Sequence, residues 1–332
     1  MSASSSSPSR AALIAGFATI YLVWGSTYLG IRIAVETLPP FLMAGARFLV
    51  AGAILGGFIA FTRGFKATAR QWRDNALIGG FLCLGGNGLV SWAEQTVPSG
   101  IATLMVSVGP LFIVLLDWLA HAFFRDGQRG SRPNTLTFTG LAVGFAGLVL
   151  LVGPSVLSEG AGHLEGSRVL GLLGACLFWS TGMIYTKYAR EPAETFTGSA
   201  IQMLCGGIWL FVVSLLTGEL SHFNPAGMSV RSVGAWAYLV AVGSLVGFTT
   251  FVWLMKHSTP TRVSTYAYVN PIVAVFLGWL VLNEPVSPRI FLAAAVIITG
   301  VVIITVAKGC KPATKAPPVS APVESAPAKQ AG

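Results

Sequence analysis

Ten long apolar runs, separated by short polar breaks, dominate the pattern of hydrophobic and polar positions along the chain. Each run holds about 18 residues or more, which lets an α-helix cross the ~30 Å hydrocarbon core of a bilayer. Hydrophobicity within each run is continuous, unlike the alternating strands of a membrane β-barrel. The runs lie near residues 12–35, 41–61, 76–93, 99–121, 136–153, 169–186, 196–216, 233–255, 262–282 and 290–307. The pattern predicts an all-α integral membrane protein with ten transmembrane helices.

Composition agrees with this prediction, because the 332 residues are 54% hydrophobic and only 10% charged. A soluble domain carries roughly 25% charged residues, so this chain cannot cover itself with a polar surface. The first apolar run is longer than the roughly 7–15-residue core of a signal peptide, and we expect it to remain as the first helix. Residues 1–11, which are polar, and residues 308–332, rich in Pro, Ala and Lys, are predicted to be disordered.

The net charge of +9 is distributed unevenly between the two sides of the predicted membrane protein. Sixteen of the 21 Lys and Arg residues fall on the side of the two termini, and only Arg168, Arg231 and Arg289 fall in the opposite loops. Cytoplasmic loops of membrane proteins carry an excess of Lys and Arg, so both termini are predicted to be cytoplasmic. The basic character is therefore a topology signal, and no nucleic-acid partner is expected.

The two halves of the chain share a spacing of proline and tryptophan. Pro110 and Trp118 are eight residues apart in GPLFIVLLDW, as are Pro271 and Trp279 in NPIVAVFLGW. Together with other matches, this predicts a five-helix unit that occurs twice, at 12–153 and 169–307, joined by a periplasmic connection at 154–168. Because five is odd, the second copy must enter the membrane from the opposite side. Such inverted repeats are common among secondary transporters.

Three longer stretches carry a family resemblance: WGSTYLGIRIAVETLPPFLMAGARF, GGNGLVSWAEQTVPSGIATLMVSVGPLF and STYAYVNPIVAVFLGWLVLNEP. They resemble the EamA family of the drug/metabolite transporter (DMT) superfamily, and within it the YedA-type exporter branch. The resemblance spans the ten helices, residues 12–307. It implies ten helices in two repeats and export of amino acids or other small metabolites across the bacterial inner membrane. It also implies a capping or loop role for Glu284 in LNEP.

Several polar and aromatic side chains are predicted near the middle of the membrane. Tyr28 lies four residues after Trp24 and hence on the same helix face. One interpretation is helix–helix packing, with Gly25, Ser26 and Thr27 allowing close approach. The other is the wall of a substrate cavity at the repeat interface. We expect the substrate-binding residues to be Trp24, Tyr28, Asn87, Trp179, Tyr266 and Asn270.

Pro110 and Pro271 are predicted to disturb their helices at mid-membrane depth. Each lacks an N–H and so deprives the carbonyl four residues earlier, at Val106 or Ala267, of its donor. A freed carbonyl is costly in lipid and should face protein or water. Both prolines are therefore candidate hinge or kink positions beside the predicted cavity.

Three charged residues are the candidate intramembrane charges, namely Arg47, Glu94 and Asp117. Intramembrane charges are expensive and usually paired or functional, and we expect Arg47 to form an ion pair with Glu94. Asp117 and His121 form an i, i+4 pair near a helix end, where an interfacial anchor is favoured over a proton relay. Arg32, with Glu36 four residues later, is expected to extend to the membrane surface.

No cofactor or metal is expected. The sequence lacks the nucleotide-binding motif GxxxxGK[ST], and its four histidines are scattered. The favoured function is a secondary transporter that exports amino acids or similar neutral or zwitterionic metabolites by alternating access, and it is not an enzyme. Alternatives are transport of nucleosides, cationic drugs or other metabolites, a passive channel, and a membrane-embedded enzyme. The expected partners are the small-molecule substrate and the lipid bilayer, with the oligomeric state, monomer included, left open.

Overall fold

The computed structural model describes residues 9–123, 134–152, 165–188, 194–258, 263 and 265–309. Within these ranges every regular secondary-structure element is a helix. The first half contains α1 (Arg10–Ala34), α2 (Pro40–Thr62), α3 (Ala69–Gly79), the π-helix η1 (Gly80–Gly88), α4 (Leu89–Ala93), α5 (Ser99–Val106), α6 (Gly109–Phe123) and α7 (Thr135–Val152). The second half contains α8 (Gly166–Tyr188), α9 (Thr195–Leu216), α10 (Glu219–His222), the 3₁₀ turn η3 (Pro225–Gly227), α11 (Val230–Tyr238), the π-helix η4 (Leu239–Val246), α12 (Gly247–His257), α14 (Tyr266–Leu282) and α15 (Pro288–Gly309).

Ten membrane-crossing rods account for the long helices of the described ranges. Eight are long and apolar enough to span a bilayer, and two shorter apolar helices, Thr135–Leu151 and Tyr266–Leu282, complete the set. Three successive elements make up one rod in each half, α3–η1–α4 and α11–η4–α12, so both of these rods have a π-helical middle. The predicted fold of ten transmembrane helices is confirmed.

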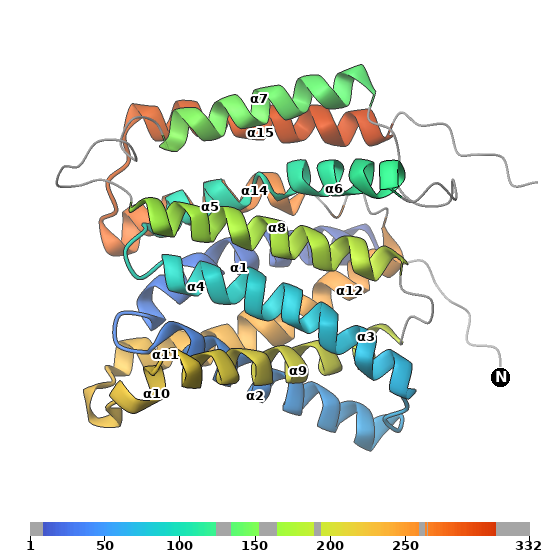
Figure 1. Ribbon diagram of the computed structural model, residues 1–332, viewed down its shortest axis with the longest axis vertical. Coiled ribbons are helices and arrows are strands. Elements are labelled where there is room, and N and C mark those ends of the chain that lie inside the picture. The colour runs from blue at the N-terminus through green and yellow to red at the C-terminus, as the bar shows by residue number, and fades with distance from the viewer. Residues whose placement is uncertain are drawn as a thin grey trace, which may run out of the picture.

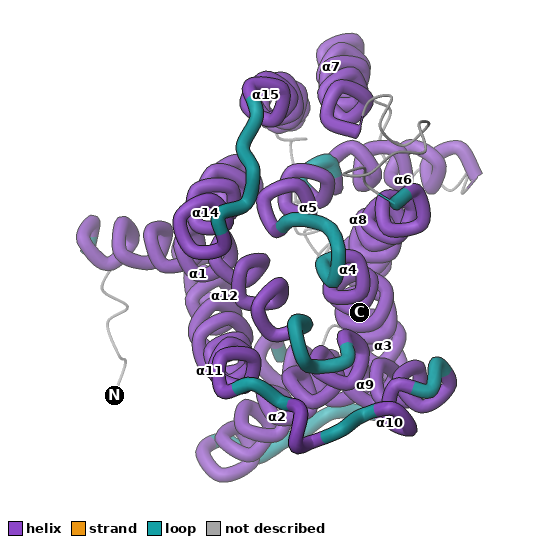
Figure 2. The backbone as a smooth tube through the Cα atoms, turned by 90° about the vertical axis from the view of Figure 1, so that its left-hand side faces the viewer, coloured by secondary structure: helices purple, strands orange, loops and turns teal. Residues whose placement is uncertain are grey.

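The two halves pack against each other through equivalent elements. In Figure 1, α1 begins and α15 ends at the same end of the bundle. The contact of α1 with α14 has its counterpart in the contact of α8 with α5 and α6. In Figure 2, α7 and α15 lie together at one edge of the bundle, while α2 and α9 lie together at the other. This reciprocal arrangement is that of two inverted five-helix repeats.

The outer surface of the bundle is strongly apolar. Phe61 is 94% exposed, Leu170 70% and Val149 69%, and many other large hydrophobic side chains are at least one-third exposed. A soluble protein rarely leaves so much contiguous apolar area in water. Lipid is the solvent that makes such a surface stable, so the exterior supports the same conclusion as the helix lengths.

Two glutamates tie helix starts to the opposite repeat. Glu284 accepts hydrogen bonds from the backbone N–H groups of Ser99 (2.8 Å) and Gly100 (3.2 Å) and from the Ser99 hydroxyl (3.1 Å), at the start of α5. It can reach them because Asn283, in the left-handed conformation at φ 53°, ends α14 just before it. Glu219 accepts in the same way from the N–H groups at the start of α2. Carboxylates stabilise helix N-termini, so the expected capping role of Glu284 is observed.

Two arginines cap the C-terminal end of the rod α3–η1–α4. Arg32 donates through Nη1 to the backbone carbonyls of Glu94 (2.7 Å) and Gln95 (2.6 Å), just after α4. Arg168 donates to the carbonyl of Trp92 and to Gln95 Oε1 (3.1 Å), and its guanidinium lies 4.0 Å over the Trp92 ring. Arg32, which was expected to extend to the membrane surface, bonds protein carbonyls at this helix end. The last carbonyls of a helix lack backbone donors, and the guanidinium supplies them.

Candidate functional site

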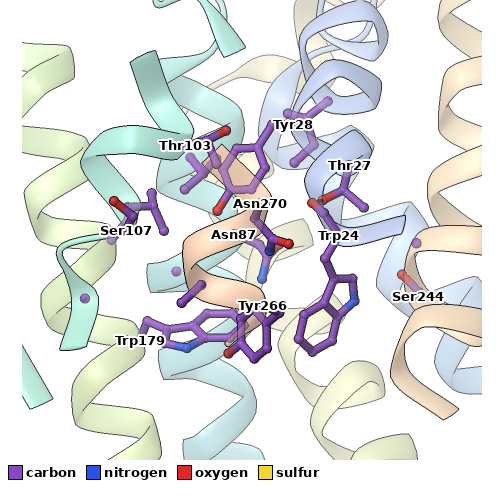
Figure 3. A pocket seen from close by; sticks show the side chains of 18 of the residues that line it. Trp24, Thr27, Tyr28, Asn87, Thr103, Ser107, Trp179, Ser244, Tyr266 and Asn270 are labelled. Carbon is purple, nitrogen blue, oxygen red and sulfur yellow. Dashed lines mark hydrogen bonds between the residues drawn. The ribbon is translucent and has the colours of Figure 1, made fainter. Parts of the chain in front are cut away.

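A cavity of about 230 Å³ lies between the two repeats and is lined by residues from both. All six residues predicted to bind substrate are on its wall, and Figure 3 shows their side chains grouped around it. They come from four separate rods, which no local sequence pattern would bring together. The six residues are Trp24, Tyr28, Asn87, Trp179, Tyr266 and Asn270.

Two tryptophans at equivalent positions of the repeats pack against glycines of the opposite repeat. A Cβ added to Gly247 of η4–α12 would lie 2.7 Å from Trp24 Nε1. A Cβ added to Gly86 of η1 would lie 2.8 Å from Trp179 Cε3. Carbon contacts this short are repulsive, so only glycine lets each indole lie against the helix that faces it. Each tryptophan therefore packs against a helix of the opposite repeat and also lines the cavity, so the two interpretations apply to the same side chains.

Aromatic rings form much of the wall. The Trp24 ring lies 4.8 Å from the Tyr266 ring in an edge-to-face arrangement and 5.0 Å from the Phe251 ring. Phe251 does not itself line the cavity, but its ring lies 6.2 Å from the Tyr266 ring, edge-to-face, and supports the two rings that do. Such pairs restrict one another and present a rigid apolar surface with polar tips. This cluster can hold an apolar side chain or the face of a cation.

The two asparagines of the wall differ in their hydrogen bonds. The Asn87 amide nitrogen donates to the Leu82 carbonyl at 3.1 Å, five residues earlier in η1. The Asn270 side-chain oxygen, in contrast, is buried without a hydrogen-bond partner in the described part of the chain. A buried unpaired amide oxygen costs free energy unless a ligand or water satisfies it. Asn270 thus offers an acceptor to whatever fills the cavity.

Hydroxyl groups not predicted from the sequence add further acceptors. Thr27, Thr103 and Ser107 line the cavity, and each donates its hydroxyl hydrogen to a carbonyl of its own helix, at Trp24, Ser99 and Leu104 respectively. With the hydrogen already engaged, a hydroxyl can offer a ligand only the lone pairs of its oxygen. No chemistry-bearing motif distinguished these residues in the sequence, because Ser and Thr are common in transmembrane helices.

The two mid-membrane prolines behave differently. The helix breaks before Pro110, since α5 ends at Val106 and α6 begins at Gly109, whereas Pro271 lies inside a continuous α14. Cys176 of α8 donates weakly to the carbonyls of Met105 (3.6 Å) and Val106 (3.8 Å) near the break. Both residues whose carbonyls lose a donor, Val106 and Ala267, line the cavity. The Val106 carbonyl thus has a protein donor, and Ala267 lies on the cavity wall, where its carbonyl avoids the cost of exposure to lipid.

The predicted ion pair between Arg47 and Glu94 is absent. Arg47 is 6% exposed, lines the cavity, and donates from Nε to the Ser244 hydroxyl at 2.9 Å. Glu94 is fully buried at the end of α4, and neither carboxyl oxygen has a hydrogen-bond partner among the residues described. The π-helix η4 brings Ser244 against α2, so the guanidinium turns toward that helix rather than toward α4. Asp117 is buried in α6, and the side chain of His121 lies outside the described residues.

The EamA-like transporter family matches this chain twice, over residues 11–153 and 166–306. The chain belongs to the EamA family. Each match covers one five-helix repeat of this EamA protein, a membrane transporter of the DMT superfamily.

Relatives of the EamA protein align with it over nearly their whole lengths. The uncharacterized inner membrane transporter YedA of Escherichia coli K12 is 37% identical over 309 residues, which is 92% of this chain and 93% of YedA. Protein PecM of Dickeya dadantii is 27% identical over 85% of this chain and 88% of PecM. A solved crystal structure matches the fold with a TM-score of 0.58 at 22% identity, covering 90% of this chain and 98% of the other. The sequence thus shows the EamA family, and the solved structure shares the overall fold.

Proposed function

We propose that this EamA protein exports amino acids or similar small zwitterionic metabolites across the bacterial inner membrane by alternating access. The observation that carries the proposal is the cavity between the repeats, whose wall combines an aromatic cluster with acceptor oxygens and one arginine. Its volume, about 230 Å³, is somewhat below the roughly 300–1,000 Å³ of sites for drug-sized ligands. A small metabolite therefore fits better than a large cationic drug.

The shared construction of the wall supports alternating access. Each repeat supplies a tryptophan that packs on a glycine of the other repeat, so tilting one repeat relative to the other changes both contacts together. Inverted repeats expose equivalent surfaces to opposite sides, and exchanging their conformations moves the opening across the membrane. The orientation proposed, with both termini cytoplasmic, rests on the sixteen Lys and Arg residues of that side.

Reconstitution in liposomes tests the proposal. Purified protein is assayed for counterflow of radiolabelled L-phenylalanine, L-leucine and L-threonine, with nucleosides and cationic drugs as competitors. Saturable amino-acid counterflow supports the proposal, and saturable flux of a nucleoside or drug alone replaces its substrate class. Flux that neither saturates nor responds to competitors indicates a channel. Chemical conversion of the solute, detected by chromatography, indicates an enzyme.

A further inference from the structure

Arg47 has unused hydrogen-bonding capacity inside the cavity. Its guanidinium carries five N–H donors, of which the Nε–H is used on Ser244. Neither terminal nitrogen has a hydrogen-bond or ion-pair partner within the described ranges, although the residue is 6% exposed. A buried guanidinium without a counter-charge is expensive, and intramembrane charges that persist usually face a cavity and mark a solute path.

In the described part of the chain, the acids that could neutralise Arg47 are engaged elsewhere or do not reach it. Glu219 accepts hydrogen bonds from the N–H groups of Phe41 and Leu42 at the start of α2. These residues precede Arg47 by more than one turn of the same helix. Glu94 makes no contact with the guanidinium, as described above. Among the cavity-lining residues that the structure describes, Arg47 is alone in carrying a charge. The protein therefore presents a positive group to the cavity without a negative one.

The space next to the guanidinium is kept open by a glycine. Gly243 lies between Thr27 and Arg47, and a Cβ there would come within 3.0 Å of Thr27 Cγ2 and 3.3 Å of Arg47 Nη2. Thr27, Gly243 and Arg47 all line the cavity. A side chain at this position would crowd the terminal nitrogen, so glycine leaves that edge of the guanidinium accessible.

We infer that the terminal nitrogens of Arg47 bind the carboxylate of the transported solute. The planar guanidinium fork matches a carboxylate with two parallel N–H···O bonds, and Ser244 fixes the orientation of the fork through Nε. The ammonium group of the same solute then meets acceptors, above all the unpartnered Asn270 oxygen. This inference rests on the proposed function, because it names the part of the substrate that determines recognition.

Phosphate groups share the chemistry that an arginine fork recognises. A doubly charged phosphate is usually held by more than one cationic group, and the described wall supplies Arg47 alone. The single positive charge therefore favours a monoanionic carboxylate. In the test, 2-phenylethylphosphonate, the phosphonate counterpart of deaminated phenylalanine, separates phosphonate binding from carboxylate binding.

The test compares matched compounds that differ only at the carboxylate or the amine. For each of phenylalanine, leucine and threonine, the L-amino acid, its primary amide, its decarboxylated amine and its deaminated acid compete in counterflow. Binding is also measured without transport, as the ligand-induced rise in the thermal unfolding midpoint of the full chain in detergent. The variants are Arg47→Gln, Arg47→Lys and Ser244→Ala. The matched control is Arg289→Gln, whose side chain bonds the Leu150 carbonyl away from the cavity.

In the wild type, we expect the amide and amine to bind roughly 10- to 100-fold more weakly than the amino acid, from the strength of charge-assisted hydrogen bonds. Arg47→Gln should reduce amino-acid affinity to that of the amide and leave the amide within about twofold, so the ratio between them approaches one. Arg47→Lys should retain part of the ratio because it keeps the charge but loses the fork. Ser244→Ala should lower the ratio of amino-acid to amide affinity in part, and Arg289→Gln should leave that ratio unchanged.

The inference is overturned if the wild type binds amino acid and amide equally, if no carboxylate binds, or if 2-phenylethylphosphonate binds better than the deaminated acid of phenylalanine, 3-phenylpropanoate. It is also overturned if Arg47→Gln weakens both compounds to the same extent. Should Arg47→Gln fail to fold, the wild-type ratios and Arg47→Lys decide the outcome. Binding of deaminated acids that depends on Arg47, without transport of any amino acid, would contradict the proposed function and leave the carboxylate inference standing.

Discussion

The indole of Trp24 in the first repeat lies against Gly247 in the second, where a Cβ would be 2.7 Å from the indole nitrogen. The counterpart contact joins Trp179 of the second repeat to Gly86 of the first. Each tryptophan therefore forms part of the cavity wall and part of the interface between repeats. A larger side chain at either glycine should displace the tryptophan and change the shape of the cavity.

Replacing Gly247 with valine should displace the Trp24 ring and reduce transport. Overpacking of this kind costs about 1–3 kcal/mol, and the displaced ring would also occupy cavity volume. The control is Gly57→Val, since a Cβ at this exposed helical position meets nothing within 4 Å. Counterflow rates and thermal unfolding midpoints should fall for Gly247→Val only. Similar losses in both variants would show that the contact with Trp24 has no special importance.

Removing the carboxylate at Glu284 should destabilise the protein without changing solute affinity. Glu284 accepts three hydrogen bonds at the start of α5, and loss of a helix N-cap costs about 0.5–2 kcal/mol. Glu284→Gln should therefore lower the unfolding midpoint, while the half-saturating solute concentration stays within about twofold. Glu36→Gln, on an exposed residue in a loop after α1, serves as the control. A large change in half-saturation for Glu284→Gln would assign this residue to solute binding instead.

Arg47 and Glu94 should behave as independent sites. No hydrogen bond or ion pair joins them, and Arg47 bonds Ser244 instead. The stability losses of Arg47→Gln and Glu94→Gln should therefore add in the double variant to within about 0.5 kcal/mol. A double-mutant cycle of unfolding free energies measures this. A coupling above about 1 kcal/mol would mean that the two charges interact after all.

Sequence patterns were sufficient for the helices and the repeat, because membrane-spanning length and the shared Pro–Trp spacing are local features. They were insufficient for the partner of Arg47. That partner depends on η4, whose π-helical backbone places Ser244 against α2. The switch from i→i+4 to i→i+5 hydrogen bonds leaves no distinct residue pattern in LVAVGSLV. A pairing of opposite charges at similar depth was the simplest expectation, and tertiary packing overrode it.

The two prolines illustrate the same limit. Pro110 and Pro271 occupy matching positions, yet the helix breaks before the first and continues through the second. Near the break, Ser180 donates to the Gly109 carbonyl at 3.2 Å, and Cys176 donates weakly to the carbonyls before it. These donors come from α8, far away in the sequence, so the proline alone could not predict the break. The hydroxyls that line the cavity were missed for a similar reason.

The proposed orientation predicts opposite accessibility for two exposed positions. In a background without the four native cysteines, Ser221→Cys should react with a membrane-impermeant thiol reagent added from outside intact cells. Arg70→Cys should react only after the membrane is permeabilised, because it lies on the side rich in Lys and Arg. Labelling is read by gel shift. The reverse pattern would show that the termini face the periplasm, and the direction of transport across the membrane would have to be reassigned.

The central claim is that the polar middle of the bundle contacts solute, and one comparison on α14 tests it most directly. Asn270 is buried and lines the cavity with an unpartnered oxygen, whereas Trp279 is 53% exposed nine residues later on the same helix. Saturable counterflow in liposomes is measured for Asn270→Ala and Trp279→Ala at equal reconstituted protein. We expect Asn270→Ala to raise the half-saturating concentration about tenfold or more, as loss of a hydrogen bond to a charged group should. Trp279→Ala should change it less than about twofold. Equal effects of the two substitutions would contradict the account, because generic packing would then explain the polar residues of the cavity.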